Sequence, residues 1–111
     1  MGSFVSGEVV VAKFPFADLS GFKLRPALVV AEVSRNRAIL CQITSQAVSD
    51  ALAIRLLDDG FTKGNLQRES FLRPTYLFTA DVSIIASRVG NLKDSKLQEV
   101  VNQIIQIVSA T

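Results

Sequence analysis

Short apolar runs rich in β-branched residues dominate this sequence, and turn-forming residues separate them. Such runs are typical of β-strands in a small sheet protein. We therefore expect strands over Glu8–Phe14, Ala27–Val33, Ala38–Ile43, Ala51–Leu57, Ser70–Asp81 and Ile84–Val89. Pro74 is expected to break Ser70–Asp81, so that this segment holds one or two strands. Gly90 is expected to end the last strand. The pattern predicts a mainly β fold.

The connections between these strands contain the residues that favour turns and loops. Pro15 is expected to end the first strand, and Phe16–Leu24 to form an exposed loop. Pro26 can open the second strand, because a missing N–H is tolerated at a strand start. Ser34–Arg37 is a polar turn that makes an antiparallel hairpin of its two flanking strands. Asp58–Glu69 is expected to be a loop with turns.

The last segment changes from a strand pattern to a helix pattern. Its apolar residues recur at helical spacing, at Leu97, Val100, Val101, Ile104, Ile105 and Val108. Asp94 or Ser95 can cap this helix, and Ser95 with Gln98 can form a capping box. We expect the stripe to pack on the sheet. Residues 1–111 are thus predicted to form one domain, a small SH3-like antiparallel β-barrel closed by a C-terminal α-helix.

Composition narrows the chemistry that this domain can perform. The chain has no histidine and one cysteine, which nearly excludes zinc, haem and Cys–His sites, so we expect no metal and no cofactor. The single Cys41 cannot form an intramolecular disulfide and is expected to be a buried free thiol. No apolar run is long enough to span a membrane and the first residues do not resemble a signal peptide, so a cytoplasmic protein is expected.

The charge balance is weakly basic, and the apolar content is high for a small monomer. Twelve basic residues against 10 acidic ones leave a net charge of +2, which permits a phosphate-bearing partner without requiring one. Hydrophobic residues make up 49% of the chain, which indicates that some apolar surface is buried against a partner.

Four motifs, taken in order, resemble one known family. Gly7–Phe16 (GEVVVAKFPF) followed by Lys23–Val30 (KLRPALVV) resembles the opening of the MazF/PemK (Kid) toxins of bacterial toxin–antitoxin pairs. Gln42–Gln46 (QITSQ) is similar to the strand end of that family. Ile85–Leu92 followed by Lys96–Val100 is similar to its closing strand and helix. The resemblance covers nearly the whole chain.

What the resemblance implies is a specific biological activity. Members of this family are compact β-barrels with a C-terminal helix that act as homodimers. They cleave single-stranded RNA sequence-specifically, as mRNA interferases, without a metal ion or an organic cofactor. A cognate antitoxin blocks the site, and promoter DNA is bound only together with that antitoxin.

The resemblance also implies which residues do the chemistry. Arg25 is expected to be catalytic, because its planar guanidinium matches phosphate oxygens and its charge is permanent. Thr44 is expected to be catalytic through a hydroxyl that donates to a phosphate oxygen. Both residues also fit plainer roles, Arg25 as a surface partner of Asp18 and Thr44 as a turn residue bonded locally.

The general base is not assigned, because the chain departs from the family at the positions that supply acidic groups. Some relatives carry an acidic residue just before the arginine, where Asp18 and Ser20 are the nearest candidates here. Others carry an Arg-x-Asp motif, where this chain has Arg73 followed by Pro74 and Thr75. We take Asp18, Ser20 and Ser45 as candidate catalytic helpers. The expected RNA-binding residues are Phe16, Phe22, Lys23, Gln46 and Arg73.

Two other functions fit the same fold. One is a non-catalytic toxin similar to CcdB, which binds DNA gyrase and cuts nothing, and the paired Arg25 and Thr44 argue against it. The other is a small DNA- or RNA-binding module of SH3-like or OB-like type, and the weak excess of positive charge argues against that one.

Overall fold

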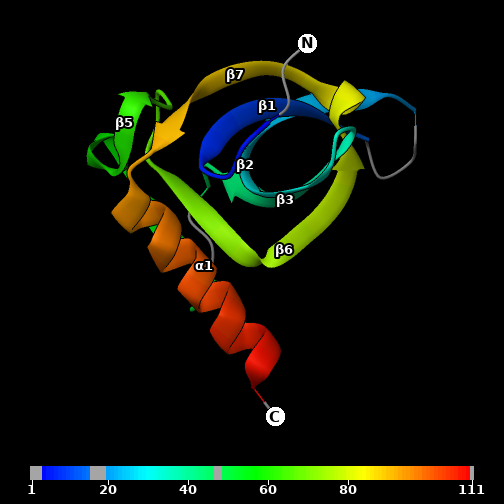
Figure 1. Cartoon of the computed structure of the whole chain (residues 1–111). Helices are drawn as coiled ribbons and strands as arrows, with labels where there is room; N and C mark the ends of the chain where they lie inside the picture. Colours follow the sequence, from blue (N-terminus) through cyan, green and yellow to red (C-terminus); the bar gives the residue numbers. More distant parts are fainter. Residues whose placement is uncertain (1–3, 16–19, 47–48, 111) are drawn as a thin grey trace.

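The computed structural model describes residues 4–15, 20–46 and 49–110, which form one curled sheet and a terminal helix (Figure 1). The strands are β1 (Glu8–Pro15), β2 (Phe22–Ser34), β3 (Arg37–Thr44), β4 (Ile54–Leu56), β5 (Phe61–Gly64), β6 (Ser70–Asp81) and β7 (Ile85–Leu92), and the helix is α1 (Asp94–Ser109). They form a 7-stranded sheet in the order β4-β6-β3-β2-β1-β7-β5, and every pairing is antiparallel. The sheet curls into a half-barrel, which confirms the predicted fold class.

The central strands are buried on both faces, which explains their uninterrupted apolar runs. Successive side chains of a strand point to opposite faces. One core contains Val9, Leu28 and Cys41, and the second contains Val10, Val29 and Leu40. Strands covered on both sides have no polar face, so they lack the alternation of a half-exposed sheet. β1, β2 and β3 therefore form the framework on which the rest of the molecule is built.

Pro26 lies inside β2, so the expectation that it opens the strand is wrong. β2 begins at Phe22, and Pro26 pairs with Val11 of β1. On its other side, the ladder between β2 and β3 ends at the pair Ala27–Gln42. Proline has no N–H with which to extend that ladder. β2 therefore remains paired with β1, whereas β3 diverges from β2. The end of the predicted loop Phe16–Leu24, from Phe22 on, belongs to β2.

Pro74 lies within a single strand, although it interrupts the hydrogen-bond ladder. β6 runs unbroken from Ser70 to Asp81, and Pro74 is buried. On the β3 side the register shifts, because Gln42 pairs with Arg73 whereas Cys41 pairs with Leu77. The bulge takes up three residues, Pro74 to Tyr76, and so includes the proline that cannot donate a hydrogen bond.

Strand β5 was not predicted, because the segment Asp58–Glu69 has the composition of a loop. Two glycines make its pairing with β7 possible. A Cβ at Gly90 would lie 2.3 Å from the carbonyl oxygen of Lys63, and Gly64 has a φ of +72°. Only glycine satisfies both the close approach and the left-handed backbone. β7 consequently continues through Gly90 to Leu92 instead of ending there.

The segment Ala51–Leu57 forms a shorter strand than expected. β4 covers only Ile54–Leu56, where two buried side chains flank an exposed Arg55. Asp50 instead begins a turn, because its side chain accepts a hydrogen bond from the backbone N–H of Leu52 at 3.0 Å. This local bond competes with extension of the strand.

The helix begins without the predicted cap. Lys93 occupies the N-cap position with no side-chain hydrogen bond, and Asp94 and Ser95 already lie inside the helix. The backbone N–H of Lys93 donates to the carbonyl oxygen of Gly60 at 2.8 Å. This tertiary bond places the first turn against the β4–β5 connection, so the capping box with Gln98 is not needed.

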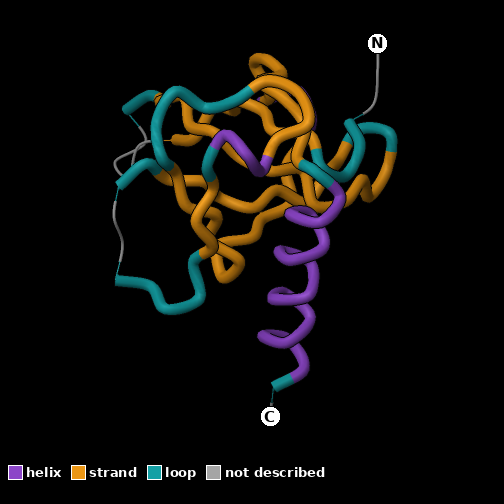
Figure 2. The backbone as a smooth tube through the Cα atoms, turned by 90° about the vertical axis from the view of Figure 1, so that its left-hand side faces the viewer, coloured by secondary structure: helices purple, strands orange, loops and turns teal. Residues whose placement is uncertain are grey.

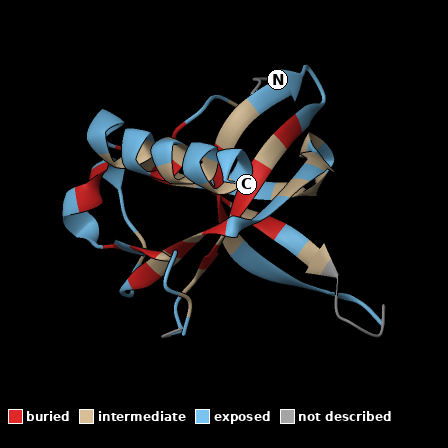
Figure 3. Ribbon diagram, turned by 90° about the horizontal axis from the view of Figure 1, so that it is seen from below, coloured by how far each residue is buried: buried red, intermediate tan, exposed pale blue. Residues whose placement is uncertain are grey.

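The apolar stripe of α1 covers the sheet along only part of its length. Val100 is buried, and Leu97 and Ile104 pack against the first core. Ile105 is 52% exposed and Val108 is 73% exposed, because the last turns extend beyond the strands (Figures 2 and 3). The prediction that the whole stripe packs on the sheet is therefore wrong for its C-terminal half. No helix in the described part of the chain is long and apolar enough to cross a membrane.

Candidate functional site

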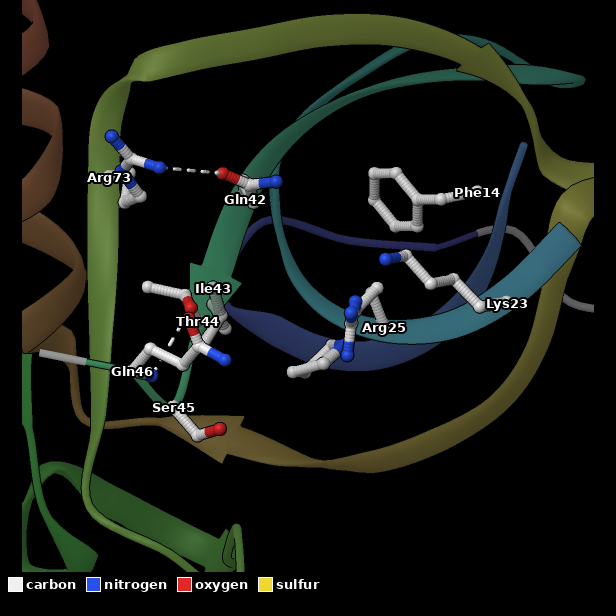
Figure 4. Close-up of a pocket in the computed structure, with 10 residues that line it drawn as sticks. Phe14, Lys23, Arg25, Gln42, Ile43, Thr44, Ser45, Gln46 and Arg73 are labelled. Carbon is white, nitrogen blue, oxygen red and sulfur yellow. Dashed lines mark hydrogen bonds between the residues drawn. The ribbon is translucent and has the colours of Figure 1, made fainter. Parts of the chain in front are cut away.

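A cavity of about 330 Å³ opens where β2 diverges from β3 (Figure 4). It is lined by Phe14 of β1, by Lys23, Arg25 and Pro26 of β2, by Gln42, Ile43 and Thr44 of β3, by Ser45 and Gln46 after it, and by Arg73 of β6. The absence of pairing between β2 and β3 beyond Ala27 and Gln42 creates this space. The cavity therefore exists because β2 and β3 separate at this point.

The lining of the cavity is cationic. Lys23, Arg25 and Arg73 contribute positive charges, and no carboxylate is among the lining residues that the structure describes. Hydroxyl and amide groups complete the polar surface. Clustered cations with neutral hydrogen-bonding groups are suited to bind a polyanion such as a nucleic-acid backbone.

Arg25 is exposed and reaches into the cavity from β2 (Figure 4). Its backbone is held extended by the pairing with Ala12 of β1. Within residues 4–15, 20–46 and 49–110, no carboxylate forms a salt bridge with its guanidinium. Asp18, the partner considered from the sequence, lies outside the described residues. The donors of Arg25 face solvent and the cavity.

Thr44 is the last residue of β3 and is half-buried at the edge of the cavity. Its Oγ1 accepts a hydrogen bond from the backbone N–H of Gln46 at 3.2 Å. The local turn bond expected for a threonine at this position is therefore present. Accepting that bond uses a lone pair and leaves the hydroxyl proton for a second partner. The turn also holds Ser45 and Gln46 at the rim, where both are exposed.

Arg73 is held on three sides. Its Nε lies 3.4 Å from Oδ2 of Asp50, and its Nη1 donates to Oε1 of Gln42 at 3.4 Å. Its guanidinium carbon lies 3.7 Å from the centroid of the Tyr76 ring. The sequence predicted Arg73 but none of its partners. Gln42 could have been recognised as a candidate site residue from the sequence, because it is the polar residue that interrupts the apolar run of β3.

The remaining predicted site residues either do not line the cavity or lie outside the described residues. Phe22 is 53% exposed at the start of β2, with Nζ of Lys13 5.1 Å from its ring centroid, and it is not among the lining residues. Ser20 is exposed and precedes β2. Phe16 and Asp18 lie outside the described residues.

One lining aromatic residue was not predicted as part of the site. Phe14 lines the cavity and packs edge to face against Phe78, with 5.1 Å between the ring centroids. Its place at the end of an apolar strand makes it indistinguishable from a core residue in the sequence.

A comparison with protein families identifies the chain. The family of PemK-like, MazF-like toxins of type II toxin–antitoxin systems matches residues 6–108. The chain belongs to this toxin family. The resemblance drawn from the four sequence motifs is thereby confirmed, and the protein is a toxin of the type II class. A sequence comparison with curated proteins gives no match.

Solved structures show that the toxin has the fold of its family. A MazE–MazF structure from Deinococcus radiodurans superposes with a TM-score of 0.78 at 19% identity and covers 100% of both chains. The Mycobacterium tuberculosis toxin MazF-mt6 gives a TM-score of 0.71 at 16% identity, over 94% of this chain and 98% of the other. A mycobacterial endoribonuclease in complex with its cognate antitoxin gives 0.74 at 9% identity, over 100% and 98%. At these identities the likeness establishes the fold alone.

Cys41 of the toxin precedes the lining residue Gln42 in β3 and packs in the first core. It is buried, and its Sγ donates to the carbonyl oxygen of Arg73 at 3.3 Å. Burial raises the pKa of this thiol from 9.0 to about 12. In the described part of the toxin, no group of three histidine, cysteine, aspartate or glutamate side chains is placed to hold a metal ion.

Cys41 should therefore resist thiol reagents in the native toxin. Raising the pKa from 9.0 to about 12 lowers the thiolate fraction by about a thousandfold at neutral pH. The folded thiol stays neutral where the unfolded one ionises, so stability should fall as the pH rises above about 9. The measurement is iodoacetamide labelling followed by mass spectrometry, with and without denaturant. Rapid stoichiometric labelling of the native toxin would contradict the burial of this thiol.

Proposed function

We propose that this toxin is an endoribonuclease that cleaves single-stranded RNA in the cavity between β2 and β3. The observation that carries the proposal is Arg25, whose guanidinium reaches a cation-lined cavity and forms no salt bridge with a described carboxylate. A phosphate group is the natural partner for such a guanidinium. A structural neighbour from a mycobacterial species is named as an endoribonuclease, which supports the same activity.

The reaction follows from the chemistry of RNA and needs no metal ion. The 2′-hydroxyl attacks the adjacent phosphorus, a cyclic phosphate forms, and the bond to the 5′-oxygen breaks. The proton of the 2′-hydroxyl passes to a base, and the departing 5′-oxygen takes up a proton. In this scheme Arg25 stabilises the negative charge that develops on the phosphoryl oxygens, and the hydroxyl of Thr44 donates to one of them.

The proton acceptor is the part of this scheme that no described side chain supplies. No carboxylate lines the described cavity. Asp18, Ser20 and Ser45 are the candidate helpers, and of the two that the structure describes, Ser45 lines the cavity and Ser20 does not. Water activated next to Arg25 and Thr44 is the alternative acceptor.

The RNA strand is proposed to follow the cationic surface. Lys23 and Gln46 line the cavity beside Arg25 and are suited to contact phosphate or sugar oxygens. Arg73 adds positive charge from β6, although two of its donors are already occupied. Phe22 is proposed to stack on a base with its exposed face. Phe16 is proposed as a second stacking residue.

A cognate antitoxin is the proposed protein partner. Structural neighbours from Deinococcus radiodurans and from a mycobacterial species are complexes of a toxin with its antitoxin. We propose that the antitoxin of this toxin blocks RNA cleavage, and that promoter DNA is bound only by the complex of the two proteins.

The toxin is also proposed to form a homodimer through the exposed end of α1. Ile105 and Val108 place apolar surface in solvent in the isolated chain, and a second copy would cover it. Sedimentation should give about twice the 12.0 kDa of the monomer. Ile105→Glu combined with Val108→Glu should shift the mass to that of the monomer, since both positions are exposed within one chain. A mass of 12.0 kDa for the unaltered toxin at micromolar concentration would refute the dimer.

Arg25→Ala should abolish RNA cleavage while leaving the fold intact. The side chain stabilises charge that is present mainly in the transition state, so the loss should fall on kcat, by about 100- to 1000-fold. Arg25→Lys should recover little, because the bidentate geometry belongs to the guanidinium. The measurement is cleavage of a mixed RNA with mapping of the ends, and exposed Arg35 in the β2–β3 turn provides the control Arg35→Ala. Near-normal cleavage by Arg25→Ala would refute the proposed role.

The cleavage rate should climb steadily with pH instead of passing through a maximum. The chain has no histidine, the side chain that ordinarily titrates near neutrality. When no side chain accepts the proton, higher pH favours loss of the proton from the 2′-hydroxyl. Initial rates from about pH 5 to 9 test this, and an acid limb that Asp18→Asn removes would identify Asp18 as the base. A bell with both limbs near neutrality, unchanged in Asp18→Asn, would contradict this account.

A further inference from the structure

The side-chain amide of Gln42 has one fixed orientation in the cavity. Its Oε1 accepts from Nη1 of Arg73 at 3.4 Å. A guanidinium has only donors, so the amide must turn its oxygen towards Arg73. The amide nitrogen then points away from Arg73 and towards the part of the cavity that holds Phe14 (Figure 4).

The group that orients Gln42 is itself immobilised. Asp50 pairs with Nε of Arg73, and the ring of Tyr76 covers the guanidinium at 3.7 Å. The side chains of Arg73 and Asp50 are only 20% and 14% exposed. Because this chain of contacts is largely shielded from water, it holds the orientation of Gln42 more firmly than an exposed pair would. Gln42 is thereby presented to the cavity as a donor.

The cavity offers two kinds of group to a ligand, charged donors and a neutral amide. Lys23 and Arg25 offer charged donors, which suit phosphate oxygens. Gln42 is neutral and less exposed than Arg25, and its amide nitrogen is turned towards the side of the cavity where Phe14 and Lys23 lie in Figure 4. A neutral amide that faces a cavity with an aromatic ring in its lining suits the edge and face of a nucleobase.

We propose that Gln42 reads a keto nucleobase, uracil or guanine, at one position of the RNA, an inference that rests on the proposed ribonuclease function. Uracil and guanine place a carbonyl acceptor where cytosine and adenine place an amino donor. Facing the amide nitrogen of Gln42, a carbonyl forms a hydrogen bond, whereas an amino group leaves two donors unpaired. Unpaired buried donors are strongly rejected, so the contact discriminates between these classes of base. Arg73 and Asp50 act as positioning residues for this contact.

The test reverses the hydrogen-bonding character of the side chain. Gln42→Glu presents an acceptor in place of the donor, and Gln42→Met retains size without hydrogen bonding. Gln46→Glu is the matched control, since it adds the same charge to the same cavity from an amide that no described side chain orients. Cleavage sites are mapped on a mixed RNA. Binding is measured with strands that lack the 2′-hydroxyl and cannot be cleaved, in two pairs that exchange uracil for cytosine or guanine for adenine.

The unaltered toxin should require uracil or guanine at one position of its cleavage site. Gln42→Glu should reverse that preference towards cytosine or adenine by about tenfold or more, and Gln42→Met should abolish it. Gln46→Glu should slow cleavage without reversing the preference at that position. An unchanged preference in both Gln42 variants, or the same reversal in Gln46→Glu, would overturn the assignment.

The binding measurement separates this inference from the proposed activity. If the toxin cleaves no RNA, the proposed function fails, yet tighter binding of uracil than of cytosine strands, or of guanine than of adenine strands, that Gln42→Glu reverses would still support the role of Gln42. Equal binding within the uracil–cytosine pair and within the guanine–adenine pair, or no binding of any strand, would overturn it.

Discussion

The divergence of β2 from β3 beyond the Ala27–Gln42 pair is the feature on which the rest of the site depends. β2 continues along β1, while the end of β3 continues along β6. Pro26 stands at this point and cannot extend the ladder, because it has no N–H. An unpaired gap in a sheet exposes backbone polar groups to water, and here that gap is the cavity. The polar cavity thus opens where Pro26 follows the last pair of the ladder between β2 and β3.

Burial on both faces keeps β1 and β2 paired where β3 diverges. Val9 and Leu28 pack into one core and Val10 and Val29 into the other, so the pairing of β1 with β2 does not depend on contacts with the end of β3. Rigid strands place side chains more precisely than loops do. Arg25 therefore projects from a well-packed strand, although its guanidinium forms no salt bridge within the described part of the chain.

The distribution of carboxylates distinguishes the two arginines of the cavity. Arg73 has Asp50 as a partner and is held in place, which makes it a support for Gln42. Arg25 has no such partner among the described residues, and its charge is available to a ligand. Two residues of the same type thus have different chemical capacities, because one guanidinium is paired with a described carboxylate and the other is not.

Local patterns in the sequence were sufficient to predict the family, the mainly β fold and the terminal helix. They also singled out Arg25, Thr44 and Arg73, which the fold brings to one cavity. These predictions depend on residues close together in the chain. β5, the continuous β6 and the N-cap of α1 at Lys93 were not predictable, because each depends on a distant partner: Gly90, β3 and Gly60 respectively. The orientation of the Gln42 side chain was not predictable from the sequence for the same reason. It requires Arg73 and Asp50 from other segments, and only tertiary packing brings their donors and acceptors within hydrogen-bonding distance.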